Sequence, residues 1–518
     1  MEKVDISKLE QLLVEVRKRE FSETNAKLIE QIIILTMNVY VALNEKKVSI
    51  QKVKKIFFDD KNAKNKQDTK ILNKEETINK AIEEQIKKHK KPIKGHGRNS
   101  TEEYKGAKKV YIKHDELKVG GKCPDKGCLG HLQNYYRKAK FVRLEGQAPI
   151  GATIYEQEIL RCSACQYCYT AKLPKEVPAE KYSPTADAMI VISRYNYAIP
   201  NNRLAKLQKD LEIPLPASVQ WERIEQVCNI LLPLFLYLQI IAAQGEILYH
   251  DDTKVRILRA LPSKNDKRTG LYTTGMVIET QGQKIALYKS GRNHAGENAS
   301  ELLSKRNPDL EPIKKMSDGS KNNNSPKIPA IIMLCLAHAR GKFKEIAEIF
   351  PSSCQLIIKL IGLIYDNDEQ TKNMNKQDRL AYHQEKSIPL LEAIKNKIKQ
   401  DFQNKRVEPN DALGQAYKYL ENNWYELTQF TRILGAPLDN NIVERILRLA
   451  VLQRKNSLFY RNDLGAMCAD IANSIIETAI LNQLNPYSYL VNLIENASAL
   501  RAKPENFLPW NFLQSQSP

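Results

Sequence analysis

The sequence predicts a multidomain α/β protein from its length, a change of hydrophobic pattern at Gly245, and a cluster of cysteines. A chain of 518 residues is longer than one ordinary hydrophobic core, so several domains are expected. Before Gly245 the apolar residues mostly recur at helical spacing, whereas after it they alternate as in strands. Five of the nine cysteines lie between Cys123 and Cys168, which predicts a separate small module there.

The charge balance predicts a nucleic-acid partner. The chain has 80 Lys and Arg against 60 Asp and Glu, a formal net charge of +20. Such a charge can also serve solubility or association with ribosomes. A nucleic-acid partner explains it more directly, because a polyanion binds where cations surround it. The N-terminal residues lack the apolar stretch of a signal peptide, and the longest apolar run, Ile230 to Ala243, is too short to span a bilayer. We therefore expect a cytoplasmic, nucleoid-associated protein without a membrane partner.

The N-terminal half predicts four segments. Apolar residues at three- and four-residue steps in residues 1–58 indicate a helical hairpin or a coiled coil, and the coiled coil would support a homodimer. Residues 59–109 are rich in Lys, Asn and Gln and predict a basic linker. The cysteine module follows in residues 110–178. Residues 179–243 read as helices with a Pro-containing turn, either a helix-turn-helix for DNA or a helical spacer.

Two close cysteine pairs predict a structural zinc site. Cys123 and Cys128 form the first pair, and Cys162 and Cys165 form the second. Paired cysteines in turns of small residues suit tetrahedral thiolate ligation of Zn²⁺ in a ribbon-like module. Free buried thiols are the alternative, and Cys168 could replace Cys165. Such a module would recognise DNA ends rather than catalyse a reaction.

The order of elements after Gly245 predicts a ribonuclease H-like core in residues 244–480. Three strand-like runs are followed by a helix, two further strands and late helices. Residues 351–430 read as a helical insertion before the last helix of the core, and residues 481–518 as a C-terminal tail.

Three separated acidic residues are candidate metal ligands. Strand alternation places Asp251 on the face of Ile247 and Tyr249, where an unpaired carboxylate is costly unless a cation satisfies it. By the same alternation Asp252 falls on a charged, solvated face. Asp318 follows a short strand, and Glu444 lies on an amphipathic helix. Alone, Asp318 could be an ordinary turn residue and Glu444 a partner of Arg448 at i, i+4 spacing.

The chain from about residue 95 onwards resembles transposases of the insertion-sequence-66 family. The resemblance is carried by HDDTKVRIL, SGRNHAGENASELL, CLAHARGKF, GAPLDNNIVERILRLAVLQRKNSLFY and the terminal LPWNF. It implies a ribonuclease H-like fold with an Asp-Asp-Glu triad at Asp251, Asp318 and Glu444, and a zinc-finger-like segment at the cysteines. One departure is Asp252, where the family commonly has Glu. Two Mg²⁺ ions held by the triad would activate a water or a DNA 3′-hydroxyl.

Other residues of the same motifs are candidate phosphate contacts. His338 follows an apolar strand and could reach the scissile phosphate as part of the catalytic set, or it could be a structural histidine. Arg448, Arg454 and Lys455 follow Glu444 and are candidate DNA-binding residues, with surface solvation as the alternative. Cys335 is expected to be a small core residue.

These observations favour a DNA transposase that cleaves the ends of an insertion sequence and joins them to target DNA. Terminal inverted repeats and target DNA would be its partners, with accessory proteins of the same element as possible additions. The alternative from another class is a catalytically inactive, zinc-containing DNA-binding relative. A nuclease that cuts without joining would use the same residues.

Overall fold

The computed structural model describes residues 119–122, 131–132, 148–161, 168–174, 177, 180–260, 268–319 and 329–516. The chain divides into two compact units, residues 1–147 and 148–518, and the fold below is that of the second unit. The predicted N-terminal helices (1–58), the basic linker (59–109) and the four candidate zinc ligands lie outside the described residues. The division falls inside the segment predicted as the cysteine module.

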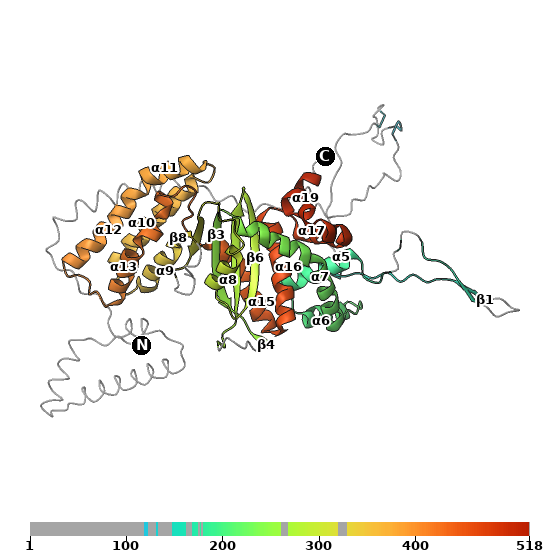
Figure 1. The fold of residues 1–518 in the computed structure, drawn as a ribbon. Coiled ribbons are helices and arrows are strands. Elements are labelled where there is room, and N and C mark those ends of the chain that lie inside the picture. Colours follow the sequence, from blue (N-terminus) through green and yellow to red (C-terminus); the bar gives the residue numbers. More distant parts are fainter. Residues whose placement is uncertain are drawn as a thin grey trace, which may run out of the picture. The chain divides into compact units, whose positions relative to one another are not determined.

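A five-stranded mixed sheet stands at the centre of the second unit (Figure 1). Its strand order is β6-β5-β3-β7-β8, with β3 and β5, and β5 and β6, antiparallel, and β3, β7 and β8 parallel. The strands are β3 (Ile247–Lys254), β5 (Tyr272–Thr280), β6 (Gln283–Gly291), β7 (Ile313–Ser317) and β8 (Ala330–Leu334). The predicted mixed α/β fold is therefore confirmed, and the strand-like run that starts β3 ends earlier than expected, with a separate short strand β4 (Ile257–Arg259) after it.

Helices cover both faces of this sheet, so it contributes to two hydrophobic clusters. Leu248 belongs to one cluster, whereas its neighbours Ile247 and Tyr249 belong to the other, as strand alternation requires. The first cluster draws on α5 (Pro184–Tyr195), α7 (Ala217–Ala243), α8 (Ala295–Leu303), α16 (Asp463–Leu481) and α17 (Pro486–Glu495). The second draws on α9 (Leu336–Ile346), α10 (Pro351–Gln370), α12 (Ile388–Gln403), α13 (Ala412–Asn422) and α15 (Asn441–Ser457).

The face of β3 that carries Asp252 is solvated only towards the end of the strand, where Asp252 is half-buried and Lys254 is exposed, so the prediction of a charged outer face is wrong for the rest of the strand. Leu248 and His250 on that face are fully buried. The reason is that α8 and α7 pack there, so a central strand is covered on both sides even where its letters alternate between apolar and polar.

The helices before and after the sheet follow the predicted order. Residues 179–243 form α5, α6 (Asn201–Asp210) and α7, with the predicted proline-containing turn between α6 and α7. The insertion comprises α10, α11 (Lys376–Lys386), α12, α13 and α14 (Trp424–Leu427), on the side of the sheet opposite α5–α7 (Figure 1). The segment described from the sequence as a tail is folded into α17, α18 (Ala497–Ala502) and α19 (Pro509–Gln516), because Leu490, Leu493 and Leu500 complete the first cluster.

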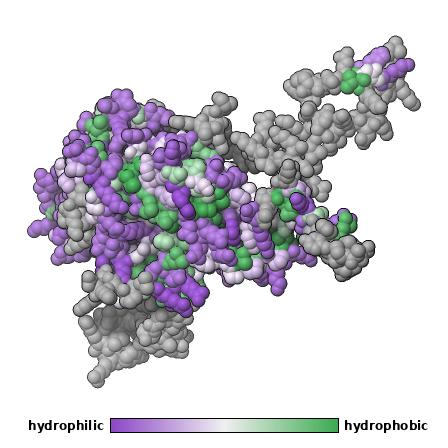
Figure 2. All heavy atoms as spheres, turned by 45° about the vertical axis from the view of Figure 1, so that its right-hand side comes forward, coloured by the Kyte–Doolittle hydropathy of each residue, from purple (hydrophilic) through white to green (hydrophobic). Residues whose placement is uncertain are grey.

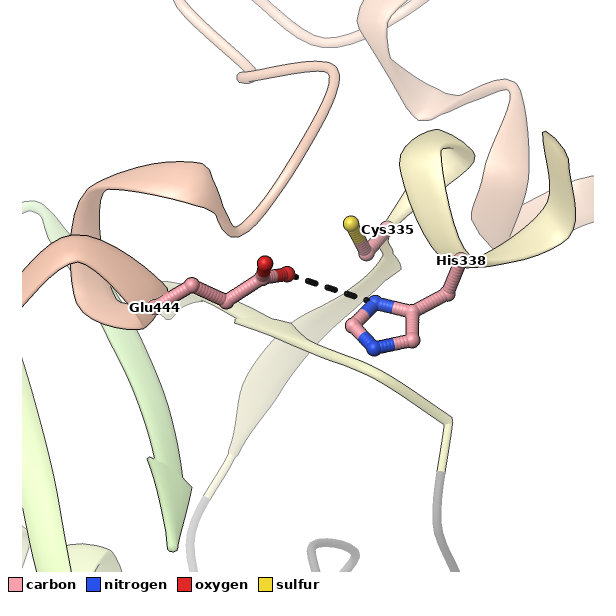
Figure 3. A group of neighbouring side chains, drawn as sticks. All are labelled: Cys335, His338 and Glu444. Atoms are coloured by element: carbon pink, nitrogen blue, oxygen red, sulfur yellow. Dashed lines mark ion pairs between the residues drawn. The ribbon is translucent and has the colours of Figure 1, made fainter. Parts of the chain in front are cut away.

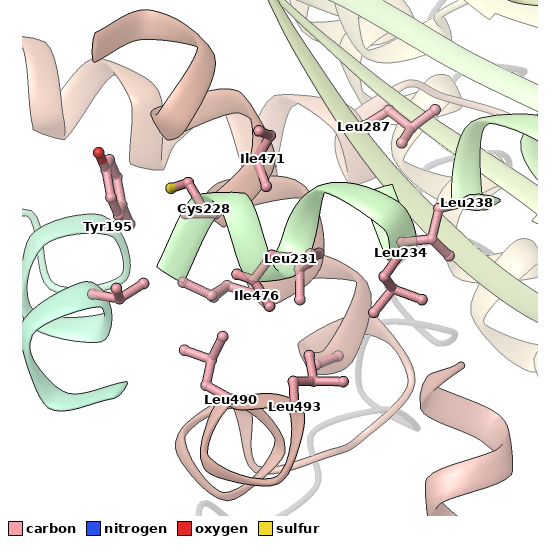
Figure 4. Close-up of a cluster of buried hydrophobic side chains, with 14 of the residues drawn as sticks. Tyr195, Cys228, Leu231, Leu234, Leu238, Leu287, Ile471, Ile476, Leu490 and Leu493 are labelled. Carbon is pink, nitrogen blue, oxygen red and sulfur yellow. The ribbon is translucent and has the colours of Figure 1, made fainter. Parts of the chain in front are cut away.

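Two described helices, α7 and α16, are long and apolar enough to cross a membrane by length and composition. Helix α16 is mostly buried inside the protein, whereas α7 buries one side and exposes Leu236 and Ile240 on the other. Figure 4 shows Leu231 of α7 beside Ile476 of α16, with Leu490 and Leu493 of α17 below them in the same cluster. On the face drawn in Figure 2, hydrophilic residues predominate and apolar residues occur in small groups, as is usual for a protein surface.

Helix α16 completes the sheet at its β6 edge. Side chains four residues apart on α16 accept hydrogen bonds from backbone N–H groups two residues apart on β6. The spacings match because four helical residues rise about 6 Å and two strand residues about 6.6 Å. The pairs, with N···O distances, are Ser290 with Asp470 (2.7 Å), Tyr288 with Ser474 (2.8 Å), Ala286 with Thr478 (3.0 Å) and Lys284 with Asn482 (3.2 Å). The edge strand thus has satisfied donors and no open ladder for another chain.

The buried end of this ladder makes stability depend on pH. Burial raises the pKa of Asp470 to about 7, although the Ser290 hydrogen bonds favour its ionised form. A raised carboxyl pKa contributes stability that is complete below about pH 4 and is lost as the pH rises through about 7. The unfolding free energy of the wild type should fall between pH 5 and 8 as Asp470 ionises. Asp470→Asn keeps the shape of the side chain but cannot ionise, so its unfolding free energy should fall by about 2 kcal/mol less over the same range. Urea denaturation at each pH measures it.

The exposed Asp210→Asn is the matched control and should leave the pH profile as in the wild type. Parallel profiles for Asp470→Asn and the wild type would contradict the assignment.

Candidate functional site

Two predicted ligands lie at the ends of adjacent parallel strands. In the β3–β7 pair, Tyr249 is aligned with Met316. Two residues further along each strand are Asp251 and Asp318, the latter directly after the last residue of β7. Parallel strands end at the same edge of a sheet, where ligands usually bind in α/β proteins. The register therefore brings two carboxylates, 67 positions apart in sequence, to one place.

The electrostatics of Asp251 reflect this crowding. Partial burial raises the pKa of Asp251 to about 6, and the carboxylates of Asp318 and Asp252 add to the rise, whereas His338 and a hydrogen bond from the Asp252 N–H to Oδ1 (2.8 Å) oppose it. Two like charges close together in a partly dry site repel, and a bound cation removes that repulsion.

Helix α15 carries Glu444 in its first turn, where it faces α9. The Glu444 Oε1 atom is 3.5 Å from Nδ1 of His338, as drawn in Figure 3. Candidate ligand atoms of Cys335, His338 and Glu444 all lie within 4.8 Å of one another. Among the described residues, neither Glu444 Oε1 nor His338 Nδ1 has a hydrogen-bond partner, although both atoms are buried. His338 therefore interacts with Asp251 on one side and Glu444 on the other.

The Cys335 side chain is the least suited of these groups to hard cations. It is fully buried, accepts a hydrogen bond from the Asn440 N–H (3.2 Å), and burial raises the pKa of its thiol to about 12. A neutral thiol in this position packs between β8 and α15, as expected for a small core residue. Mg²⁺ prefers oxygen, so the carboxylates are the better ligands.

Two residues that the sequence did not single out fix the position of α15. Gly275 of β5 pairs with Asp251, and a Cβ atom there would lie 2.9 Å from Leu447 of α15. Asn440, immediately before α15, is fully buried and donates from Nδ2 to the His250 carbonyl (3.1 Å). Together they hold the helix of Glu444 against the strand of Asp251. Asn440 stands inside the PLDNNIVER motif, so its place in that motif was the available signal.

Asp252 has a structural role at the start of α8. Its Oδ2 atom lies 3.0 Å from Nδ1 of His294 and accepts a hydrogen bond from the Ala295 N–H (3.1 Å). A carboxylate that binds a first-turn N–H stabilises a helix N-terminus. Asp252 is therefore occupied, and Asp251 is the carboxylate directed to Asp318.

The three candidate DNA-binding cations differ in their surroundings. Arg448 and Lys455 are exposed on α15. Arg454 is half-buried, and its Nη1 atom donates to Oγ1 of Thr253 (3.3 Å) and to the Lys254 carbonyl. Arg454 thus joins the last turn of α15 to the end of β3.

Comparison with known proteins decides the family. The family model described as "Transposase IS66 family" matches residues 180–468, which include the whole sheet, the insertion and α15. The chain belongs to the IS66 transposase family. The match begins after the cysteine cluster Cys123–Cys168, so the family assignment rests on the part of the chain that contains Asp251, Asp318 and Glu444.

Three relatives from Sinorhizobium fredii are themselves named as uncharacterised proteins. Protein y4jD is 31% identical over 200 residues, which cover 38% of this chain and 38% of that protein. Protein y4hP is 23% identical over 393 residues, covering 70% of this chain and 68% of that protein. Protein y4qI is 24% identical over 182 residues, or 34% and 33% of the two chains. The alignments thus span from 33% to 68% of the lengths of these relatives.

The two neighbouring aspartates should respond differently to substitution. Asp252→Ala removes the partner of the Ala295 N–H and should lower the unfolding free energy by about 1 kcal/mol. Asp251→Asn relieves repulsion from Asp318 and should not destabilise the metal-free protein. Thermal unfolding in EDTA measures both variants. Equal destabilisation would show that the division of roles between these residues is wrong.

Proposed function

We propose that this protein is a DNA transposase that cleaves the ends of an insertion sequence and transfers them to target DNA. The observation that supports the proposal is the β3–β7 register, in which Asp251 and Asp318 each follow the aligned pair Tyr249 and Met316 by two residues. His338 acts electrostatically on Asp251 and lies 3.5 Å from Glu444, which supports a common site for the three acids. The sheet order, with three antiparallel strands followed by two parallel ones, is that expected of a ribonuclease H-like catalytic domain. Membership of a transposase family supports the same reaction.

The residues present fit divalent cations. Asp251, Asp318 and Glu444 offer hard oxygen ligands, the pKa of Asp251 is raised by burial beside another carboxylate, and Glu444 Oε1 is buried without a hydrogen-bond donor in the described part. Two bound Mg²⁺ ions would activate the attacking hydroxyl and stabilise the departing oxygen. Asp251 and Asp318 would hold the site from the sheet, and Glu444 would close it from α15. His338 would leave Glu444 and contact the scissile phosphate instead.

The sharpest test is cleavage of a plasmid that carries the coding region with its flanking DNA. Asp251→Asn should lower the rate of Mg²⁺-dependent cleavage by about 10²- to 10³-fold, since it removes a metal ligand. DNA binding without added Mg²⁺ should remain close to that of the wild type. The exposed Asp309→Asn is the matched control and should cleave normally.

Normal cleavage by Asp251→Asn would overturn the site. Binding without any cleavage by the wild type would favour the inactive DNA-binding relative. Cleaved ends that never join a target would indicate a nuclease.

We also propose that Cys123, Cys128, Cys162 and Cys165 bind one structural Zn²⁺. Support comes from the backbone on either side of each pair. Lys122 pairs with His131 around the first pair, and β1 (Ile159–Arg161) pairs with β2 (Cys168–Thr170) around the second. Each pair would thus stand between two paired extended segments, as in a zinc knuckle.

Removal of this zinc should unfold the module and weaken binding to DNA ends, because small metal domains depend on the ion for folding. Cys162→Ser should abolish bound zinc, measured by elemental analysis of the purified protein. Cys168→Ser, which changes the neighbouring cysteine outside the set, should keep it. A zinc content that is unchanged in Cys162→Ser would contradict the assignment.

We propose DNA as the main partner, together with a second copy of the chain in a homodimer and accessory proteins of the same element. A cytoplasmic, nucleoid-associated location would follow from action on chromosomal DNA. The net charge of +20 supports contact with a polyanion.

A further inference from the structure

A groove of about 570 Å³ lies away from the carboxylates, between the start of α7 and a two-stranded ribbon. The ribbon is formed by β4 and β9 (Tyr460–Asn462), which run parallel with Arg259 opposite Asn462. We call it the arginine groove and define it by Arg194, Trp221, Arg259, Phe459 and Arg461, which all line it.

The charge of the arginine groove is positive and uncompensated. No acidic residue lines it, and Arg259 and Arg461 are both exposed. Within the described ranges, neither of these two arginines has a carboxylate at salt-bridge distance. Arg194 donates to Oγ of Ser457 and so is held at the end of α15. Guanidinium groups without acidic partners favour an anionic ligand, and their planar donors suit phosphate.

Two helix starts add to this charge. Asn201 begins α6 and Ala217 begins α7, and both residues line the groove. The preceding residues, Pro200 and Pro216, give no side-chain cap, so first-turn N–H groups are not satisfied from the cap positions. Helix N-termini carry partial positive charge and bind phosphates. They reinforce the arginines.

Aromatic side chains accompany the arginines. Phe459 is 41% exposed, so part of its ring is open to the groove. Trp221 and Tyr460 are partly buried in the same wall. Cations that follow a backbone together with an open aromatic face are the features by which proteins hold a nucleic-acid strand.

The groove is joined rigidly to the catalytic residues. Helix α15 runs from Glu444 near the carboxylates to Ser457 beside Arg194, which is about 20 Å at 1.5 Å per residue. Arg454 fastens its last turn to the end of β3, the strand of Asp251. A length of about 20 Å corresponds to about six nucleotide steps of 3.4 Å.

We propose that the arginine groove binds one strand of the DNA that flanks the scissile phosphate, about six nucleotides from it. Arg259 and Arg461 contact phosphates, and Phe459 stacks on a base. The position relative to cleavage rests on the proposed function; the binding itself does not.

The test is binding of a fluorescent 20-nucleotide single-stranded DNA to the full chain without added Mg²⁺ or chelator, over a range of salt concentrations. Each phosphate contact on single-stranded DNA contributes about 0.7 to the slope of log affinity against log salt. The double variant Arg259→Ala/Arg461→Ala should bind more weakly, with a slope smaller by about 1.4. Arg406→Ala/Lys399→Ala, which removes two exposed cations near the end of α12 in the insertion, is the charge-matched control and should keep the slope.

Phe459 is tested separately. Phe459→Ala should lower the affinity about five- to hundredfold with the slope unchanged, because stacking involves no counterions, whereas Phe459→Tyr should bind as the wild type does.

Wild-type affinity and slope in the double variant, or an equal loss in the control, would overturn the proposal. The binding test needs no Mg²⁺ and is therefore independent of the cleavage test. If the wild type cleaves DNA but the double variant keeps the wild-type salt slope, only the groove proposal fails. If the double variant has a smaller salt slope but the wild type does not cleave DNA, only the proposed transposase reaction fails.

Discussion

Repulsion between two carboxylates at the ends of adjacent parallel strands is the constraint around which this molecule is arranged. Asp251 and Asp318 are aligned by the β3–β7 register, and the pKa of Asp251 is raised to about 6 by burial and by its acidic neighbours. Such a pair lowers stability unless a cation or a proton lies between the charges. Its retention in an otherwise well-packed protein favours a function that supplies the cation, as a metal-dependent phosphoryl transfer would.

The surrounding structure holds this unfavourable arrangement in place. Gly275 allows α15 to approach the strand of Asp251, and Asn440 fixes the start of the helix to the same strand. Asp252, although next in sequence, binds the start of α8, so its charge raises the pKa of Asp251 only from the side while its oxygen is held by the Ala295 N–H. At the far edge of the sheet, α16 satisfies the outer N–H groups of β6 through side chains at four-residue intervals. The sheet is thereby fixed from the edge inwards, and the site rests on a rigid element.

The sequence allowed the order of elements along the chain, the insertion and the family to be inferred, because each depends on local pattern or on motifs. The partial burial of Asp251 followed from alternation alone. The covered face of His250 did not, because alternation shows that two faces differ and cannot show that α8 packs on the polar one. Gly275 and Asn440 escaped notice for a related reason. The role of Gly275 depends on α15 and that of Asn440 on β3, each more than 150 residues away, and the sequence near either residue does not reveal the contact.

The most direct measurement is a crystal structure of the protein soaked with Mn²⁺, with anomalous scattering used to locate the ions. The account predicts two Mn²⁺ ions held by oxygen atoms of Asp251, Asp318 and Glu444, with His338 released from Glu444. Anomalous density absent from the space between the two aspartates, in crystals saturated with Mn²⁺, would contradict it.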